Sequence, residues 1–219
     1  MKNIRNIIIF VLAIITAICL VVISSSKNNS IYPDTNSPEA GFARDMSIHH
    51  QQALEMSFLV RERSSNESIR SFAFDIINTQ ATQRGMMFGW LQLWDLSFTT
   101  AVEPMLWMDM DHHVDMGHEE EDSMDHHGTM DMKKYNFTPG AFMPGMATKE
   151  EMNQLADSTG RQSEKIFLEL MIRHHQGGVL MAEGIVDLTE IDQVKNLAQT
   201  MIDGQNTEIE YMEELLKSY

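Results

Sequence analysis

Methionine and histidine side chains are concentrated between residues 105 and 146, at spacings that could hold a metal ion. The pattern Met-Asp-His-His-x-x-Met occurs there twice, beginning at Met110 and at Met124. Thioether sulfur is a soft donor, imidazole is borderline and carboxylate is hard, so the mixture suits Cu(I), Cu(II) or Ag(I). Zinc fits less well, because methionine is not among its usual ligands. The candidate ligands in this segment are Met108, Met110, His112, His113, Met116, His118, Met124, His126, His127, Met130 and Met132.

A second set of methionine and histidine residues recurs in two copies at an offset of 125 residues, from Met46 to Met171. A repeated offset of this kind is the signature of an internal duplication. Residues three and four apart are neighbours on a helix, so each Met-x-x-His-His element could supply sulfur and nitrogen to one ion. The alternative for the methionines is that they fill the core. The candidate ligands are Met46, His49, His50 and Met56 in the first copy, and Met171, His174, His175 and Met181 in the second.

The elements around these residues are predicted to be helices. Ser37-Pro38 is typical of a helix start, and the first copy is expected to form helices up to about Arg63 and from Glu67 to Ser97. The second copy is predicted to contain a short helix after Thr148 and helices at 161–188 and 189–217, with Thr189 as a cap. No segment has the alternation of a strand. Two related hairpins predict an all-α fold, an antiparallel four-helix bundle that brings the two His pairs to equivalent positions.

The N-terminal residues from Ile4 to Ile23 are almost all apolar, which is long enough for a membrane-spanning helix. Lys2 and Arg5 favour an internal N-terminus and an external domain. A cleaved signal peptide ending near Ser24 is the alternative, and both place the domain outside the cytoplasm, secreted if cleavage occurs. The predicted organisation is an anchor and linker at 1–36, a first hairpin at 37–98, a flexible Met/His-rich linker at 99–147, and a second hairpin at 148–219.

The composition narrows the class of partner. The formal net charge of -16 disfavours nucleic acid and favours cations, although acidity also serves solubility. The single cysteine, Cys19, lies in the apolar run, so a soft-metal site in the rest of the chain must use thioether and imidazole.

The Met-x-x-His-His-Gln elements, the Gln80/Met87 and Gln205/Met212 spacings and the segment from Met143 to Thr148 resemble the family known as domain of unknown function 305. Its studied members include periplasmic copper-binding proteins of the CopM type. The resemblance covers about residues 37–216 and implies a ferritin-like four-helix bundle, copper binding outside the cytoplasm and a role in copper resistance. By motif match it implies the same eight Met and His residues of the two copies as metal ligands.

Three functions are compatible with these patterns. The first is a copper-binding protein that sequesters ions or delivers them to a partner protein, without catalysis. The second is a ferritin-like oxidase of Cu(I); a di-iron enzyme is disfavoured because neither His-His helix contains Glu-x-x-His. The third is an envelope scaffold or chaperone, which leaves the repeated His pairs unexplained. We expect the first function, and we do not expect an enzyme.

Overall fold

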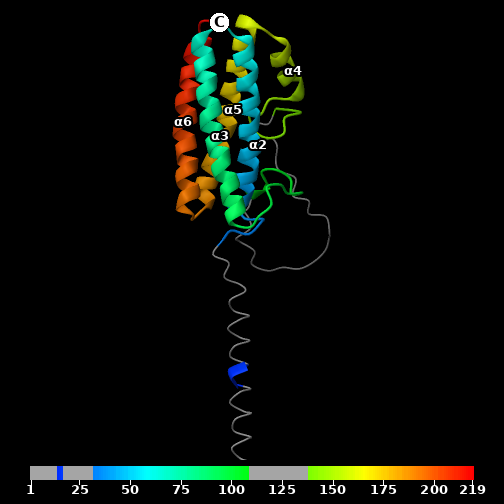
Figure 1. Ribbon diagram of the computed structural model, residues 1–219, viewed down its shortest axis with the longest axis vertical. Helices are drawn as coiled ribbons and strands as arrows, with labels where there is room; N and C mark the ends of the chain where they lie inside the picture. The colour runs from blue at the N-terminus through cyan, green and yellow to red at the C-terminus, as the bar shows by residue number, and fades with distance from the viewer. Residues whose placement is uncertain (1–13, 17–31, 109–137) are drawn as a thin grey trace, which may run out of the picture. The chain divides into compact units, whose positions relative to one another are not determined.

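The computed structural model describes residues 14–16, 32–108 and 138–219, and all regular structure within them is helical. Four long helices lie side by side as a bundle (Figure 1). A short helix, α4, packs beside α2 and α5. The bounds are Pro38–Arg63 for α2, Glu67–Leu93 for α3, Lys149–Asp157 for α4, Gly160–Leu188 for α5 and Asp192–Leu216 for α6. The prediction of an all-α fold is confirmed.

Two of the predicted helix starts are confirmed by their hydrogen bonds. The side chain of Ser37 accepts from the backbone N–H of Ala40, ahead of Pro38 at the first helical position. Thr148 and Glu151 form the reciprocal capping box that opens α4. These bonds satisfy backbone donors that have no partner inside the helix.

Two predicted boundaries were wrong. The second helix ends at Leu93 rather than at Ser97, because Asp95 adopts a left-handed φ of 57° and the N–H of Leu96 bonds back to Leu91. Thr189 does not cap the last helix through its side chain. Its hydroxyl accepts from the backbone N–H of Ile191, the residue before α6, and donates to Glu39 at the start of α2, a contact 150 residues apart in sequence.

The bundle is built from two hairpins that meet through their first helices. Helix α2 packs on α3, α5 packs on α6, and α2 also packs on α5. The outer helices touch as well, since the Phe72 and Tyr211 rings lie 5.0 Å apart. The duplicated Met-x-x-His-His elements therefore lie on the two helices that join the halves.

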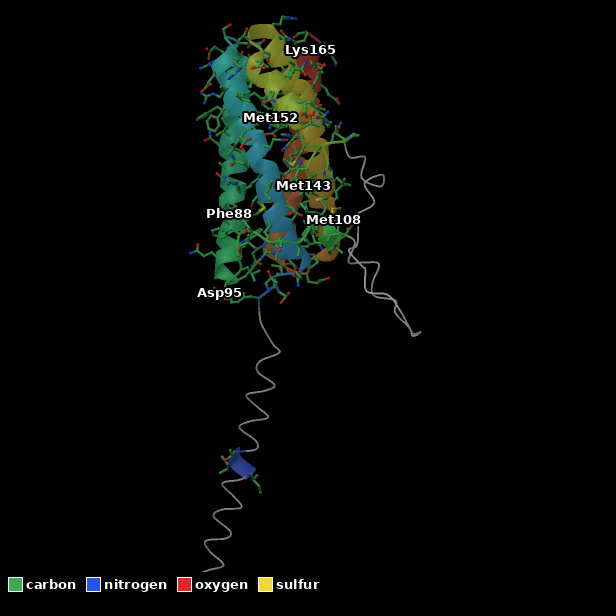
Figure 2. The ribbon with its side chains drawn as sticks, turned by 90° about the vertical axis from the view of Figure 1, so that its right-hand side faces the viewer. Phe88, Asp95, Met108, Met143, Met152 and Lys165 are labelled. Atoms are coloured by element: carbon green, nitrogen blue, oxygen red, sulfur yellow. The ribbon has the colours of Figure 1, made fainter. Side chains whose placement is uncertain are left out.

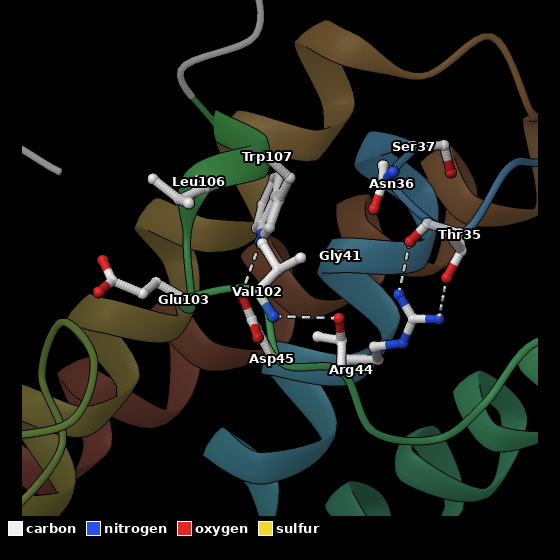
Figure 3. A pocket seen from close by; sticks show the side chains of 11 residues that line it. Thr35, Asn36, Ser37, Gly41, Arg44, Asp45, Val102, Glu103, Leu106 and Trp107 are labelled. Atoms are coloured by element: carbon white, nitrogen blue, oxygen red, sulfur yellow. Dashed lines mark hydrogen bonds between the residues drawn. The ribbon is translucent and has the colours of Figure 1, made fainter. Parts of the chain in front are cut away.

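Both described ends of the 99–147 segment are packed into the bundle. Asp45 on α2 accepts a hydrogen bond from the backbone N–H of Met105, at 2.7 Å. It also accepts one from the indole N–H of Trp107, at 2.8 Å (Figure 3). Met143 and Met146, at the other end, are buried in the same apolar cluster as Met105. The segment is thus held to the bundle on each side of residues 109–137.

A pocket of about 340 Å³ lies beside this attachment, lined in part by Arg44, Asp45 and Trp107 (Figure 3). The guanidinium of Arg44 donates hydrogen bonds to the carbonyl oxygen of Ser97 and to the carbonyl and hydroxyl oxygens of Thr35. None of the four histidines of the duplicated elements lines the pocket. The pocket is therefore separate from the predicted histidine ligands of α2 and α5.

The chain divides into two units at residues 34 and 35, and the second of them contains the helical bundle. The predicted membrane span at 4–23 lies outside the described residues, apart from Ile14–Thr16. Within the described residues, no helix is both long enough and apolar enough to cross a membrane.

Candidate metal centre

The two His pairs meet halfway along α2 and α5, in the interior of the bundle. The ring centroids of His49 and His174 are 3.8 Å apart, with 35° between the ring planes. The rings of His174 and His175 follow at 6.3 Å. No member of the two pairs, His50 included, exposes more than 1% of its surface. The duplication therefore brings four imidazoles together where water is excluded.

The two inner histidines use Nε2 to bond a backbone carbonyl. His49 Nε2 lies 3.1 Å from the carbonyl oxygen of Pro144, and His174 Nε2 lies 3.0 Å from the carbonyl oxygen of His49. A carbonyl oxygen only accepts, so each Nε2 must carry the hydrogen. In a neutral ring the lone pair then lies on Nδ1.

The two outer histidines use Nε2 to bond a side chain of the neighbouring helix. His50 Nε2 lies 2.8 Å from Oε1 of Gln83 on α3, and His175 Nε2 lies 2.6 Å from Oε2 of Glu208 on α6. An amide oxygen and a carboxylate both accept, so Nε2 is again the donor. Nε2 is thus the donor in all four rings.

The interior also holds polar atoms that have no hydrogen-bond partner. The Nδ1 atoms of the four histidines are buried and unpartnered. The same holds for both side-chain polar atoms of Gln80 and Gln205. A buried polar atom left unpaired costs about 1–3 kcal/mol, so natural proteins rarely concentrate them. Such a cluster is typical of a place where a ligand or internal water binds.

Burial keeps three of the four histidines, His49, His50 and His174, in the neutral form. It is the main cause that lowers the pKa of His49 to about 3 and that of His50 to about 4. Burial also lowers the pKa of His174 well below its usual value, with the neighbouring imidazoles acting in the same direction. A neutral imidazole with a free lone pair is the form that binds metal, so these rings need lose no proton to bind a metal at neutral pH.

The four methionines of the duplicated elements are completely buried on either side of the histidines. Met46 and Met181 belong to one apolar cluster, and Met56 and Met171 belong to the other. Of these four thioethers, each cluster thus contains one from each copy. Along α2, Met46 lies one turn before His49 and Met56 about two turns after it, so only Met46 is near enough to share an ion with His49.

The carbonyl that accepts from His49 is held by a close backbone contact. A Cβ atom at Gly177 on α5 would lie 2.0 Å from the Pro144 oxygen, so only glycine allows the loop to approach. Gly145 has a left-handed φ of 74°, and Gln52 on α2 bonds both the N–H and the C=O of Ala147. The segment after Pro144 is therefore fixed against both His-bearing helices.

The model of the family named Domain of unknown function (DUF305) matches residues 39–216, which includes all of these features. The chain belongs to the DUF305 family. No curated protein matches the sequence. The resemblance drawn from the duplicated motifs is thereby confirmed.

Solved DUF305 structures share the fold. The chain is 42% identical to a DUF305 protein from Streptomyces coelicolor, with a TM-score of 0.69 over 84% of this chain and 95% of that one. It is 29% identical to a DUF305 fragment from Deinococcus radiodurans, with a TM-score of 0.61 over 83% and 97%. CopM in its Cu(II)-bound form is 23% identical, with a TM-score of 0.53 over 83% and 97%. At that identity, CopM supports the fold alone.

Among the predicted linker ligands of this DUF305 chain, Met108 alone lies within the described residues. Its side chain packs against Gly184 on α5 and against the apolar cluster that contains Met143. Met108 and Met143 are labelled in Figure 2. The other ten lie outside the described residues: Met110, His112, His113, Met116, His118, Met124, His126, His127, Met130 and Met132.

Sequence reasoning did not assign a site role to the residues that orient the histidines. Gln83 and Glu208 were not singled out, although the offset of 125 relates them just as it relates His50 to His175. Gln80 and Gln205 were noted only as matched positions. Among the described residues, no group of three or more His, Cys, Asp or Glu side chains is arranged to hold a metal ion.

Proposed function

We propose that this protein binds copper outside the cytoplasm, and that it sequesters the ion or passes it to a partner protein without catalysing a reaction. One observation carries the proposal: four buried imidazoles have their Nε2 atoms engaged in hydrogen bonds and their Nδ1 atoms unpartnered. Metal-binding histidines have this arrangement, in which the second ring nitrogen bonds an oxygen that fixes the tautomer.

The neighbouring thioethers indicate which metal the site would take. Met46 and Met171 lie one turn before the His pairs, and the linker adds further sulfur and imidazole donors. Sulfur with imidazole favours copper over zinc and hard cations, and silver shares the preference of Cu(I) for sulfur. CopM, which shares the fold, has been solved in Cu(I)-, Cu(II)- and Ag-bound forms.

The location outside the cytoplasm rests on the N-terminal sequence. The apolar run from Ile4 to Ile23 has the length of a membrane anchor, and the Streptomyces relative carries a name that proposes secretion. In the proposed arrangement the linker collects ions and the bundle holds them. Thioethers release a metal without taking up a proton, which suits transfer by ligand exchange.

Equilibrium dialysis against Cu(I), Cu(II) and Ag(I) tests this function. We expect the purified full-length chain to retain copper. A matched linker-substituted chain, in which the ten Met and His residues between Met110 and Met132 are replaced by Ser, should retain fewer ions but not lose binding. If the unmodified chain retains neither Cu(I) nor Cu(II), the proposal is wrong.

A further inference from the structure

The two halves of the bundle differ in charge next to their outer histidines. The offset that relates His50 to His175 also relates Gln83 to Glu208. His50 donates to the neutral amide of Gln83, at 2.8 Å, whereas His175 donates to the carboxylate of Glu208, at 2.6 Å. The same ring atom, Nε2, therefore donates to an amide in one half and to a carboxylate in the other.

A second charge widens the difference. Arg84 follows Gln83, and its positive charge acts on His50 in the same direction as burial, which is the main cause that lowers the pKa of that ring. The guanidinium stays close to α3, with its carbon 4.9 Å from the centre of the Phe88 ring. The equivalent position in the second half is Ile209, which carries no charge.

The other candidate donors are matched between the halves. Met46 corresponds to Met171, and Gln80 corresponds to Gln205. Both methionines are fully buried, and both glutamine amides are buried without partners. The donor types are thus the same, and the two outer imidazoles differ in the charges of the groups next to them.

Each half of the bundle offers one set of donors, which we call a half-site: His50 with Met46 and Gln80, and His175 with Met171 and Gln205. We propose that the half-site at His175 binds Cu(II) in preference to Cu(I), and that the half-site at His50 has the opposite preference. The inference rests on the proposed copper-binding function. An ion of charge two gains more from a nearby carboxylate, and loses more near a guanidinium, than an ion of charge one. A carboxylate that accepts from Nε2–H also strengthens Nδ1 as a donor.

In this account, Glu208 is a positioning residue that acts through His175. Its side chain is 25% exposed, and the side chain of His175 is fully buried. The carboxylate therefore lies at the edge of the bundle and contacts the interior through the ring of His175. Gln83 orients His50 in the same way but adds no charge.

The test exchanges the two acceptors in the linker-substituted full-length chain. Competition titrations with chelators measure the Cu(II) and Cu(I) affinities of Glu208→Gln and of Gln83→Glu. We expect Glu208→Gln to weaken Cu(II) binding by about 10–100-fold, the usual effect of removing such a partner, and to change Cu(I) binding by less than about threefold. Gln83→Glu should strengthen Cu(II) binding by about tenfold and add a second Cu(II) signal in electron paramagnetic resonance.

The ratio of the two affinities distinguishes an effect of charge from a loss of packing. Poorer packing would weaken the binding of both ions equally, so equal changes in Cu(I) and Cu(II) affinity would overturn the proposal, as would no change in either variant. If Glu208→Gln does not fold, Gln83→Glu alone tests whether the charge of the acceptor sets the preference between Cu(II) and Cu(I). Failure of the unmodified chain to bind copper would instead overturn the proposed function.

Discussion

Acidification from pH 7 to pH 4 should lower the free energy of unfolding of the metal-free protein by on the order of 5 kcal/mol. The cause is the set of buried neutral histidines, whose pKa values fall to about 3 for His49 and about 4 for His50. In the unfolded chain these histidines have a pKa near 6.5. They therefore take up protons at pH values at which the folded bundle keeps them unprotonated. The stability from these groups is fully present above pH 6.5 and is lost as the pH falls toward 3.

One buried carboxyl acts in the opposite direction. Burial is the main cause that raises the pKa of Asp45 to about 6, so the folded protein takes up this proton before the unfolded chain does. Between pH 6 and 4 this group adds about 2–3 kcal/mol of stability as the pH falls. The histidines outweigh it, because His49 and His50 each lose about 2–2.5 kcal/mol of stability between pH 6 and 4, and the contribution of His174 has the same sign.

Urea unfolding at pH 7, 5.5 and 4, followed by circular dichroism, measures this dependence. His50→Leu serves as the control, because it removes one titrating group and should reduce the slope by about 1 kcal/mol per pH unit between pH 4 and 6.5. A bundle that is equally stable at pH 7 and pH 4 would show that the histidines are not buried as neutral rings.

Replacing Gly177 with Ala should destabilise the protein by about 3 kcal/mol. The added methyl group would meet the backbone of Pro144 and Gly145, which cannot rotate away as a side chain would. The loop must move off α5, and His49 then loses its carbonyl acceptor. Thermal or urea unfolding of the variant measures the loss.

Gly204→Ala is the matched control for this substitution. Gly204 also lies inside a helix, but a Cβ atom there would meet nothing within 4 Å. Alanine should therefore stabilise α6 by about 0.5–1 kcal/mol. If the two alanine variants were equally stable, the contact between the loop and α5 would not be as tight as described.

The helices and the duplication were readable from the sequence because both depend on local or periodic signals. Ser37-Pro38 and the Thr148 capping box mark their own helix starts, and the offset of 125 identifies the second copy. One boundary that failed depends on the local left-handed conformation of Asp95, and the other on a tertiary contact. The hydroxyl of Thr189 bonds Glu39 as well as the N–H of Ile191, and no pattern near Thr189 indicates a partner so far along the chain.

The candidate site was predictable in its residue types and not in its hydrogen bonding. The His pairs were found, but the acceptors that fix their tautomers come from α3, α6 and the Pro144 loop. Gly177 is an example. A glycine inside a helix indicates only weak helix propensity, whereas Gly177 is needed because the loop at Pro144 packs directly against it. The anchor, the ferritin-like relationship and the metal roles of the linker residues stay predictions.

X-ray absorption at the copper edge of the copper-loaded, linker-substituted chain tests the central claim most directly. We expect nitrogen and sulfur atoms in the first coordination shell, with both signals reduced when His49, His50, His174 and His175 are replaced by leucine in a chain that remains helical. A shell of oxygen atoms alone, or a spectrum that does not change when the histidines are replaced, would contradict a copper site inside this bundle.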